Sequence, residues 1–329
     1  MRAGLAMIRP HTLRAAGKAR KGVRSFSRSV VQAARMRIGY VPEHFATPII
    51  FAKDRFGLEA DLQAVPDGTG TLATRLKSTD PGKQIDVAFG LLEGFVADLG
   101  KTKSAGQQTD YSLVGTYVQS PLRWGISTGG KKHDISGVHD LRGKRVGVSR
   151  IGSGSYVMSF VLADQCEWLN ESDAAPFEVI VSGRFEDLRK AVNEDRADFF
   201  MWDHTTTQKY WDNGELKRIG EIYTLWPSWA IAVNRRVSSD DVDSLLGKIN
   251  QGVQYFHANT DLAIEHITST MHYSDKDARE WLKSVEFSDD VTGVDPAVVD
   301  RTADLLRRTG VLKAGSGGSD HMVSMLRGA

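Results

Sequence analysis

The sequence has only one cysteine, Cys166, among its 329 residues. A single thiol cannot form an intrachain disulfide, and it cannot build a cysteine-rich metal site. No His-Glu-x-x-His motif is present either, so the sequence predicts neither a metal centre nor a cofactor. The protein must therefore be stabilised by hydrophobic cores, and 329 residues are enough for two lobes of ordinary size.

Long hydrophobic runs are also missing. No segment approaches the roughly 20 consecutive apolar residues that a membrane-spanning helix requires. The composition of 41% hydrophobic and 25% charged residues is close to the average of globular proteins. We therefore expect a chain that does not span a membrane.

Acidic residues are absent before Glu43, whereas ten basic residues occur within residues 1–37. The same segment contains several hydroxyl side chains, and "RSFSRS" at 24–29 is similar to a fungal mitochondrial processing site. Such a composition is typical of a mitochondrial transit peptide, which we expect over residues 1–35 and which predicts a matrix protein. A basic arm that binds RNA or lipid is the alternative.

The rest of the chain is acidic, with 32 basic residues against 41 acidic ones. A negatively charged body is poorly suited to hold a polyanion. We therefore predict a small-molecule partner and no nucleic-acid partner.

Short β-type runs alternate with amphipathic helical segments along the chain, which is typical of an α/β fold with mainly parallel sheets. The predicted strands are 36–41, 60–65, 85–90, 111–118, 144–149, 177–182 and 197–202. Thr47 is expected to cap, and Pro48 to open, a helix that Gly57 ends. From residue 238 the pattern is helical, and the tail over 313–329 is expected to be flexible.

The segment "VGVSRIGSGSYV" at 146–157 runs from a strand through Gly152-Ser153-Gly154-Ser155 into a helix. Free backbone N–H groups and the positive end of a helix dipole favour an anion at such a turn. The dinucleotide and phosphate-loop motifs are not matched. We predict a site for a carboxylate, sulfonate or phosphate at Ser153, Gly154 and Ser155, with a plain helix cap as the alternative.

Further candidates follow predicted parallel strands, where ligands collect in open α/β sheets. They are His44, Thr69, Gly70, Gly90, Glu93, Asp203 and His204. Glu93 and Asp203 would supply negative charge opposite the anion turn, so the cleft would suit a small ligand with one acidic and one basic end. Trp202 would offer either a flat apolar wall or a core side chain.

Four segments carry a resemblance to a known family: "MRIGYVPEHFATPIIFAKDRFGL", "DVAFGLLEG", "DLRGKRVGVSRIGSGSYV" and "FEDLRKAVNEDRADFFMW". They resemble type II periplasmic-binding-protein folds, in the branch with sulfonate binders, thiamine-pyrimidine binders and the fungal pyrimidine-synthesis enzyme. The likeness covers about residues 36–310 and is closest to a fungal offshoot of this branch.

The resemblance implies two lobes with a ligand cleft between them. The first lobe would comprise 36–121 and 235–312, and the second 122–234, with hinge crossings near 121–127 and 227–234. His44, Thr69, Gly70, Gly90 and Glu93 would face the cleft from the first lobe, and Ser153, Gly154, Ser155, Asp203 and His204 from the second. Closure would dehydrate the ligand.

The resemblance also bears on the class of function. The pyrimidine-synthesis enzyme has a cofactor-binding Lys and a His where this chain has Gly90 and Gly94, and its cysteine-rich motif is absent here. We therefore expect a non-catalytic, hinge-closing protein that binds a zwitterionic or anionic metabolite, such as a pyrimidine- or sulfonate-like compound. An enzyme of thiamine-pyrimidine or related cofactor metabolism is the alternative, and the sequence does not identify a membrane transporter partner.

Overall fold

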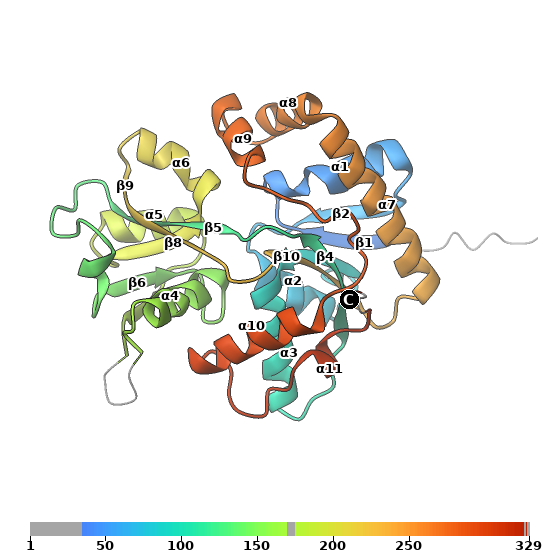
Figure 1. Cartoon of the computed structure of the whole chain (residues 1–329), viewed down its shortest axis with the longest axis horizontal. Coiled ribbons are helices and arrows are strands. Elements are labelled where there is room, and N and C mark those ends of the chain that lie inside the picture. The colour runs from blue at the N-terminus through green and yellow to red at the C-terminus, as the bar shows by residue number, and fades with distance from the viewer. Residues whose placement is uncertain (1–34, 170–174, 326, 328–329) are drawn as a thin grey trace, which may run out of the picture. The chain divides into compact units, whose positions relative to one another are not determined.

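The computed structural model describes residues 35–169, 175–325 and 327, which form two lobes, each built on one β-sheet (Figure 1). The predicted transit segment lies outside these residues, apart from Arg35. Within the described ranges, no helix has both the length and the apolar character needed to cross a membrane.

The first lobe contains a sheet in the order β2-β1-β3-β10-β4. The strands are β1 (Met36–Tyr40), β2 (Ala60–Ala64), β3 (Val87–Leu91), β4 (Tyr111–Val118) and β10 (Trp229–Asn234). β1 pairs in parallel with β2 and β3, whereas β10 runs antiparallel to both β3 and β4. Strands β4 and β10 are buried along their whole length, because helices cover both faces of this sheet.

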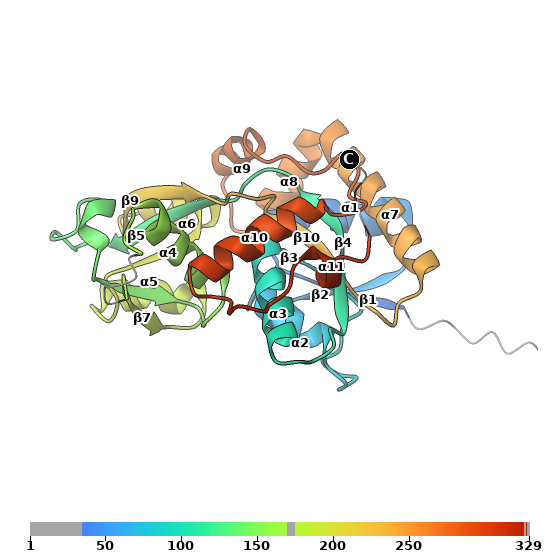
Figure 2. The ribbon, with the colours of Figure 1, turned by 60° about the horizontal axis from the view of Figure 1, so that its bottom comes forward.

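Helices from both ends of the chain cover the first sheet (Figure 2). They are α1 (Thr47–Phe56), α2 (Thr69–Leu76), α3 (Leu92–Ser104), α7 (Ser239–Ala258), α8 (Thr260–Thr270), α9 (Asp275–Leu282), α10 (Pro296–Arg308) and α11 (Ser319–Met322). Gly57 ends α1 in the left-handed conformation, with φ of 69°, as expected. Thr47 does not cap α1, because a 3-10 turn over His44–Ala46 precedes the helix.

The second lobe contains a sheet in the order β7-β6-β8-β5-β9. The strands are β5 (Arg123–Gly129), β6 (Arg145–Val148), β7 (Glu178–Val181), β8 (Phe199–Asp203) and β9 (Leu216–Tyr223). Parallel strands β6, β7 and β8 alternate with helices α4 (Gly154–Gln165), α5 (Phe185–Asn193) and α6 (His204–Asp212). This is the βαβ arrangement that the sequence pattern predicts.

Two connections join the lobes, one between β4 and β5 and one between β9 and β10. Residues 229–234, which the sequence assigns to the second lobe, lie instead in the first sheet as β10. Their unbroken apolar run suits a central strand that is buried on both faces.

The C-terminal segment packs on the first lobe instead of extending freely, contrary to expectation. Met322 is fully buried, the Ser324 amide donates to the Leu113 carbonyl, and the hydroxyls of Ser112 and Ser324 lie 2.7 Å apart. A glycine-rich composition usually indicates a flexible tail. Here Gly315 and Gly317 instead adopt φ of 81° and 71°, which turns the chain back onto the lobe.

Candidate functional site

A cavity of about 70 Å³ lies between the lobes, where loops after the strands of both sheets meet. Both lobes contribute to its wall. The first lobe provides Val41, Glu43, Pro66, Asp67, Gly68, Thr69, Leu91 and Trp229, and the second provides Trp124, Ser149, Arg150, Ser153, Gly154, Ser155, Trp202 and Asp203, with Leu122 from the connection. We call this space the central cavity.

The glycine turn forms one wall of the central cavity. The Ser153 hydroxyl caps α4 by accepting from the Tyr156 amide at 3.3 Å and donates to the Arg150 carbonyl at 2.8 Å. The Ser155 hydroxyl accepts from the Ser149 amide at 3.1 Å. Both serines are thus engaged within their own loop, and the N-terminus of α4 remains directed at the cavity wall through Gly154.

Two buried indole groups line the same cavity without a hydrogen-bond partner. Trp124 and Trp229 are 3% and 4% exposed, and neither Nε1–H finds an acceptor within the described residues. The β5–β8 register places Trp124 beside Asp203, and the β10–β3 register places Trp229 beside Leu91. A buried donor without an acceptor is costly, so both groups are suited to a ligand oxygen.

Two carboxylates approach the cavity from opposite lobes. Glu43 follows β1, and Asp203 ends β8, where its Oδ1 accepts from the Thr206 amide at 2.7 Å and caps α6. Burial, and then the charge of Asp203, raise the pKa of Glu43 to about 8. Burial also raises the pKa of Asp203 to about 6, against the stabilising hydrogen bonds from Thr206. The pair therefore retains a proton near neutral pH.

Arg150 carries positive charge across the cleft. Its guanidinium Nη1 donates to the Asp67 carbonyl of the first lobe at 3.1 Å. The group also lies against Gly70, where a Cβ atom would overlap it. Burial lowers the pKa of Arg150, although an arginine remains charged at neutral pH. Gly70 is thus required as a surface for this arginine rather than as an open ligand contact.

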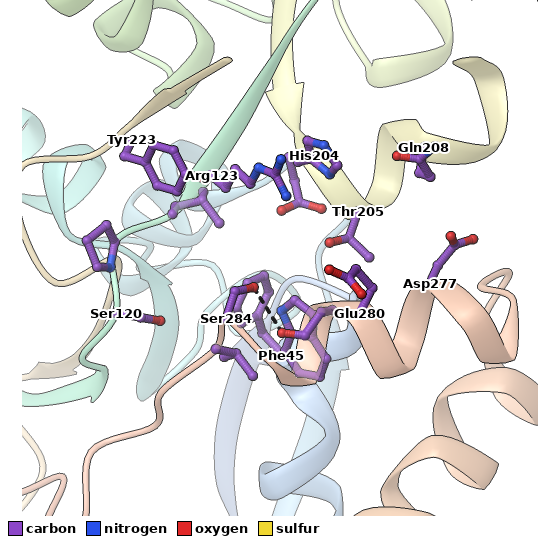
Figure 3. Close-up of a pocket in the computed structure, with 15 residues that line it drawn as sticks. Phe45, Ser120, Arg123, His204, Thr205, Gln208, Tyr223, Asp277, Glu280 and Ser284 are labelled. Atoms are coloured by element: carbon purple, nitrogen blue, oxygen red, sulfur yellow. Dashed lines mark hydrogen bonds between the residues drawn. The ribbon is translucent and has the colours of Figure 1, made fainter. Parts of the chain in front are cut away.

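Two larger cavities adjoin the central one. One of about 250 Å³ shares Asp203 and Leu122 with it and contains Arg123, His204, Asp277 and Glu280. Figure 3 shows Arg123 and His204 facing Glu280 of α9 across this space. Another, of about 480 Å³, shares Glu43 and Trp202 and is lined by aromatic side chains that include Phe185 and Tyr210. The cleft therefore continues on both sides of the central cavity.

The structure brings together six of the eleven predicted site residues. Thr69, Ser153, Gly154, Ser155, Trp202 and Asp203 line the central cavity, and His204 lines the cavity beside it. Trp202 is both an apolar wall of the cavity and a packed side chain, since it lines the cavity and stacks on Phe185 with ring centroids 5.1 Å apart. His204 has its pKa lowered to about 4, first by burial and then by Arg123.

The other predicted residues lie away from the cavity surface. Glu93 is fully buried and accepts from Trp226 Nε1 at 2.9 Å. His44 is 1% exposed among aromatic rings, and burial lowers its pKa to about 3, so it is neutral. Gly90 packs against Thr69, which leaves 3.0 Å between that side chain and a Cβ placed on the glycine.

Of three further side chains that shape the cavity, the sequence indicates Glu43 only as part of the loop after the first strand, and it does not indicate Arg150 or Trp124. Glu43 precedes the predicted His44 by one residue, and Arg150 precedes the glycine turn by two, so both lay within the segments singled out. Trp124 begins the second lobe and gave no signal of its own, because an aromatic residue in a strand usually indicates core packing.

The cavity is lined both by residues with unpartnered donors and by carboxylates, with no cluster suited to metal chemistry. Within the ranges that the structure describes, no group of three or more His, Cys, Asp or Glu side chains could hold a metal ion. The arrangement can hold a small polar molecule by hydrogen bonds and charge.

Comparisons with known proteins identify the class first. The alkanesulfonate-binding protein SsuA from Xanthomonas axonopodis pv. citri bound to MOPS has a TM-score of 0.67 at 18% identity, over 86% of this chain and 95% of that one. The aliphatic sulphonate binding protein SsuA from Escherichia coli has a TM-score of 0.63 at 17% identity, over 90% and 94%. The chain has the two-lobed fold of type II periplasmic binding proteins.

The family follows from a nearer relative. The Candida albicans CA3427 gene product, described as defining a family with the generic periplasmic binding protein fold, has 38% identity and a TM-score of 0.78, over 89% of this chain and 96% of that one. The profile of the Ca3427-like PBP family matches residues 124–222. This chain belongs to the Ca3427-like family. The comparison with curated protein sequences finds no match.

Proposed function

We propose that the protein binds a small zwitterionic or anionic metabolite in the central cavity and closes around it by hinge motion of the two lobes. The unpartnered indole N–H groups of Trp124 and Trp229 carry this proposal. Both tryptophans and Gly154, the first residue of α4, line this cavity, so a ligand group held there would lie near three sources of partial positive charge.

Hinge closure is supported by the way the lobes are joined. Only the connections after β4 and β9 cross between the sheets in the described part of the chain, and a rotation there would leave both sheets intact. Closure would remove a bound ligand from water and strengthen each polar contact, since charges interact more strongly at low dielectric.

A sulfonate-like ligand is in keeping with the two sulfonate-binding SsuA proteins, a pyrimidine-like ligand rests on the resemblance alone, and the absence of catalysis is supported by Gly90 and Gly94. A Cβ on either glycine would approach Thr69 to 3.0 Å or less. These positions therefore have little room for the Lys and His of the pyrimidine-synthesis enzyme, which the resemblance places there. We propose a binding protein without a cofactor.

A thermal-shift screen of the full chain tests this function. The panel contains amino acids, sulfonates, phosphate esters and pyrimidines at millimolar concentration. A ligand at 100 times its dissociation constant adds about 2.7 kcal/mol to stability, which a melting curve detects readily. We expect Trp124→Phe to weaken the response at least tenfold in affinity, because it removes one N–H donor at the cavity.

Trp168→Phe is the matched control, since Trp168 packs against Phe177 with ring centroids 5.9 Å apart and does not line the cavity. Equal loss of affinity in both variants would contradict the proposed site. No stabilisation by any member of the panel would contradict the proposed ligand class. Mass spectrometry of the recovered ligand distinguishes binding from conversion.

We also propose that residues 1–35 direct the protein to the mitochondrial matrix. The support is the excess of basic residues and the lack of acidic ones in this segment. A fluorescent fusion of the full chain should enter mitochondria, whereas a fusion with Arg20, Lys21, Arg24 and Arg28 changed to Glu should stay in the cytosol. Identical distributions would refute the proposal.

A further inference from the structure

Glu43 and Asp203 line the central cavity from different lobes and lie close enough for the charge of Asp203 to act on Glu43, so together they supply negative charge to the cavity wall. Glu43 follows the last residues of β1 in the first lobe, and Asp203 ends β8 in the second. Two acids that come from different lobes approach each other only when the lobes adopt this arrangement. A ligand group placed between them would therefore be held by both lobes.

The neighbouring groups leave this negative charge incompletely neutralised. Glu43 has no hydrogen bond or ion pair from its carboxylate to any residue that the structure describes. Asp203 accepts from the Thr206 amide, and the nearby Arg123 is engaged by Glu221 at 2.7 Å. On α6 and the segment after α8, the Thr206 and Tyr273 hydroxyls lie 3.0 Å apart and carry no charge.

The remaining charged groups at the cavity do not change this conclusion. Arg150 is directed to the Asp67 carbonyl, and Asp67 itself pairs with Arg184 at 2.7 Å. His44, next to Glu43, is neutral because burial lowers its pKa to about 3. The unpartnered donors of Trp124 and Trp229 line the same cavity, so groups of opposite character face one small volume.

We propose that Glu43 and Asp203 form a subsite for a small cationic group of the ligand, a primary ammonium or an amidinium, so that the ligand is a zwitterion rather than a simple anion. This inference rests on the proposed function and selects one of its two ligand classes. The anionic end would be held by the indole N–H groups and the N-terminus of α4.

A proton takes the place of the cation when the cavity is empty. The pKa values of Glu43 and Asp203 are raised to about 8 and about 6, by burial first and, for Glu43, by its acidic neighbour. A bound cation favours the ionised carboxylates and lowers both pKa values. Binding should therefore release protons near pH 7, and affinity for a zwitterion should increase from pH 6 to pH 8.

Calorimetric titration of the full chain with matched pairs of ligands tests the subsite. The pairs are taurine with ethanesulfonate, β-alanine with propionate, and phosphoethanolamine with ethyl phosphate. We expect the amine-bearing member of at least one pair to bind tenfold or more tightly than its partner. Heats measured at pH 7 in buffers of different ionisation enthalpy should show proton release.

Glu43→Gln should reduce the difference within a pair to less than threefold, whereas Glu59→Gln, which removes an exposed acid of the first lobe, should leave it unchanged. Equal binding of both members, or binding of the amine-free member alone, would overturn the subsite and leave the proposed function standing. Binding by no member would overturn both. Should the Gln variant fail to fold, the absence of proton release from the native chain would by itself refute the subsite.

Discussion

Glu93 is held in the core of the first lobe by one hydrogen bond from Trp226, and its Oε1 atom has no partner among the described residues. Burial raises the pKa of this carboxyl to about 7, partly opposed by the bond from Trp226. The folded protein then binds a proton that the unfolded chain has lost at the same pH. Glu93 is therefore a pH-dependent element of stability rather than a contact of the cavity.

The direction of the pH dependence of stability follows from the number of protons bound by the folded and unfolded states. Between pH 4.5 and about 7 the folded state binds more protons than the unfolded state at Glu93, so this residue makes stability fall as the pH rises. Glu93→Gln keeps the shape and removes the titration. In urea unfolding, the free energy of unfolding of the variant relative to that of the native protein should increase by at least about 1 kcal/mol between pH 5 and pH 8.

The contributions of Glu43 and His44 are present in both proteins and cancel in this difference. Glu59→Gln, at an exposed position, should follow the native pH dependence. Parallel curves for the native protein and the Glu93 variant would contradict the assignment.

At the scale of single residues, the sequence predicts which loops reach the cavity more reliably than which side chains in those loops line it. Asp203 and Thr69 reach the cavity as predicted, but Glu93, on the first turn of α3, points to Trp226, which lies 133 residues later in the chain. A partner so distant leaves no local signal. His44, the predicted contact, is buried among aromatic rings, whereas its neighbour Glu43 lines the cavity.

At the scale of elements, α7 shows how closely helices pack in the first lobe. Its apolar face contacts α1, and Gly252 lies where a Cβ would overlap the Pro48 carbonyl oxygen and come within 2.9 Å of the Ala52 Cβ. Gly247, one and a half turns earlier, is exposed and has no atom within 4 Å of such a Cβ. The two glycines thus differ only in what surrounds them.

The same substitution should therefore have opposite effects at these positions. Gly252→Ala should destabilise the protein by about 1–3 kcal/mol, because the backbone of α1 must move away. Gly247→Ala should stabilise it by up to about 1 kcal/mol, because alanine favours an exposed helix interior. Chemical denaturation of the two variants measures both changes in the free energy of unfolding. Effects of the same sign would show that the α1–α7 contact is not as close as described.

Elements with strong periodicity were predicted well, and elements that depend on tertiary contacts were not. The predicted strand over 111–118 agrees with β4 to the residue. The placement of β10 beside β3 and β4 could not be deduced, since an apolar run does not specify its neighbours. The C-terminal packing was missed for a different reason, because a glycine-rich tail is usually flexible.

At the scale of the whole molecule, few polar contacts hold the lobes together. They include the Arg184–Asp67 and Arg308–Asp164 ion pairs, both at 2.7 Å, and the Arg150 bond to the Asp67 carbonyl. Exposed ion pairs contribute little to folding. Open and closed states of a hinged protein also differ little in free energy, so such pairs can shift their populations.

The double variant Arg184→Ala and Arg308→Ala should therefore open the cleft without unfolding either lobe. Small-angle scattering of the ligand-free protein should give a larger radius of gyration, while the melting temperature changes little. Lys283→Ala, which removes an exposed pair within the first lobe, is the control. An unchanged radius of gyration would show that these pairs do not influence the hinge.

The insertion of β10 between β3 and β4 has a consequence for the order of events during synthesis. Until residue 234 has left the ribosome, the first sheet has a gap between β3 and β4, whereas every strand of the second sheet is complete by Tyr223. The later lobe in the sequence can thus fold before the earlier one. Protease treatment of stalled nascent chains should show residues 123–223 protected first, and simultaneous protection would refute this order.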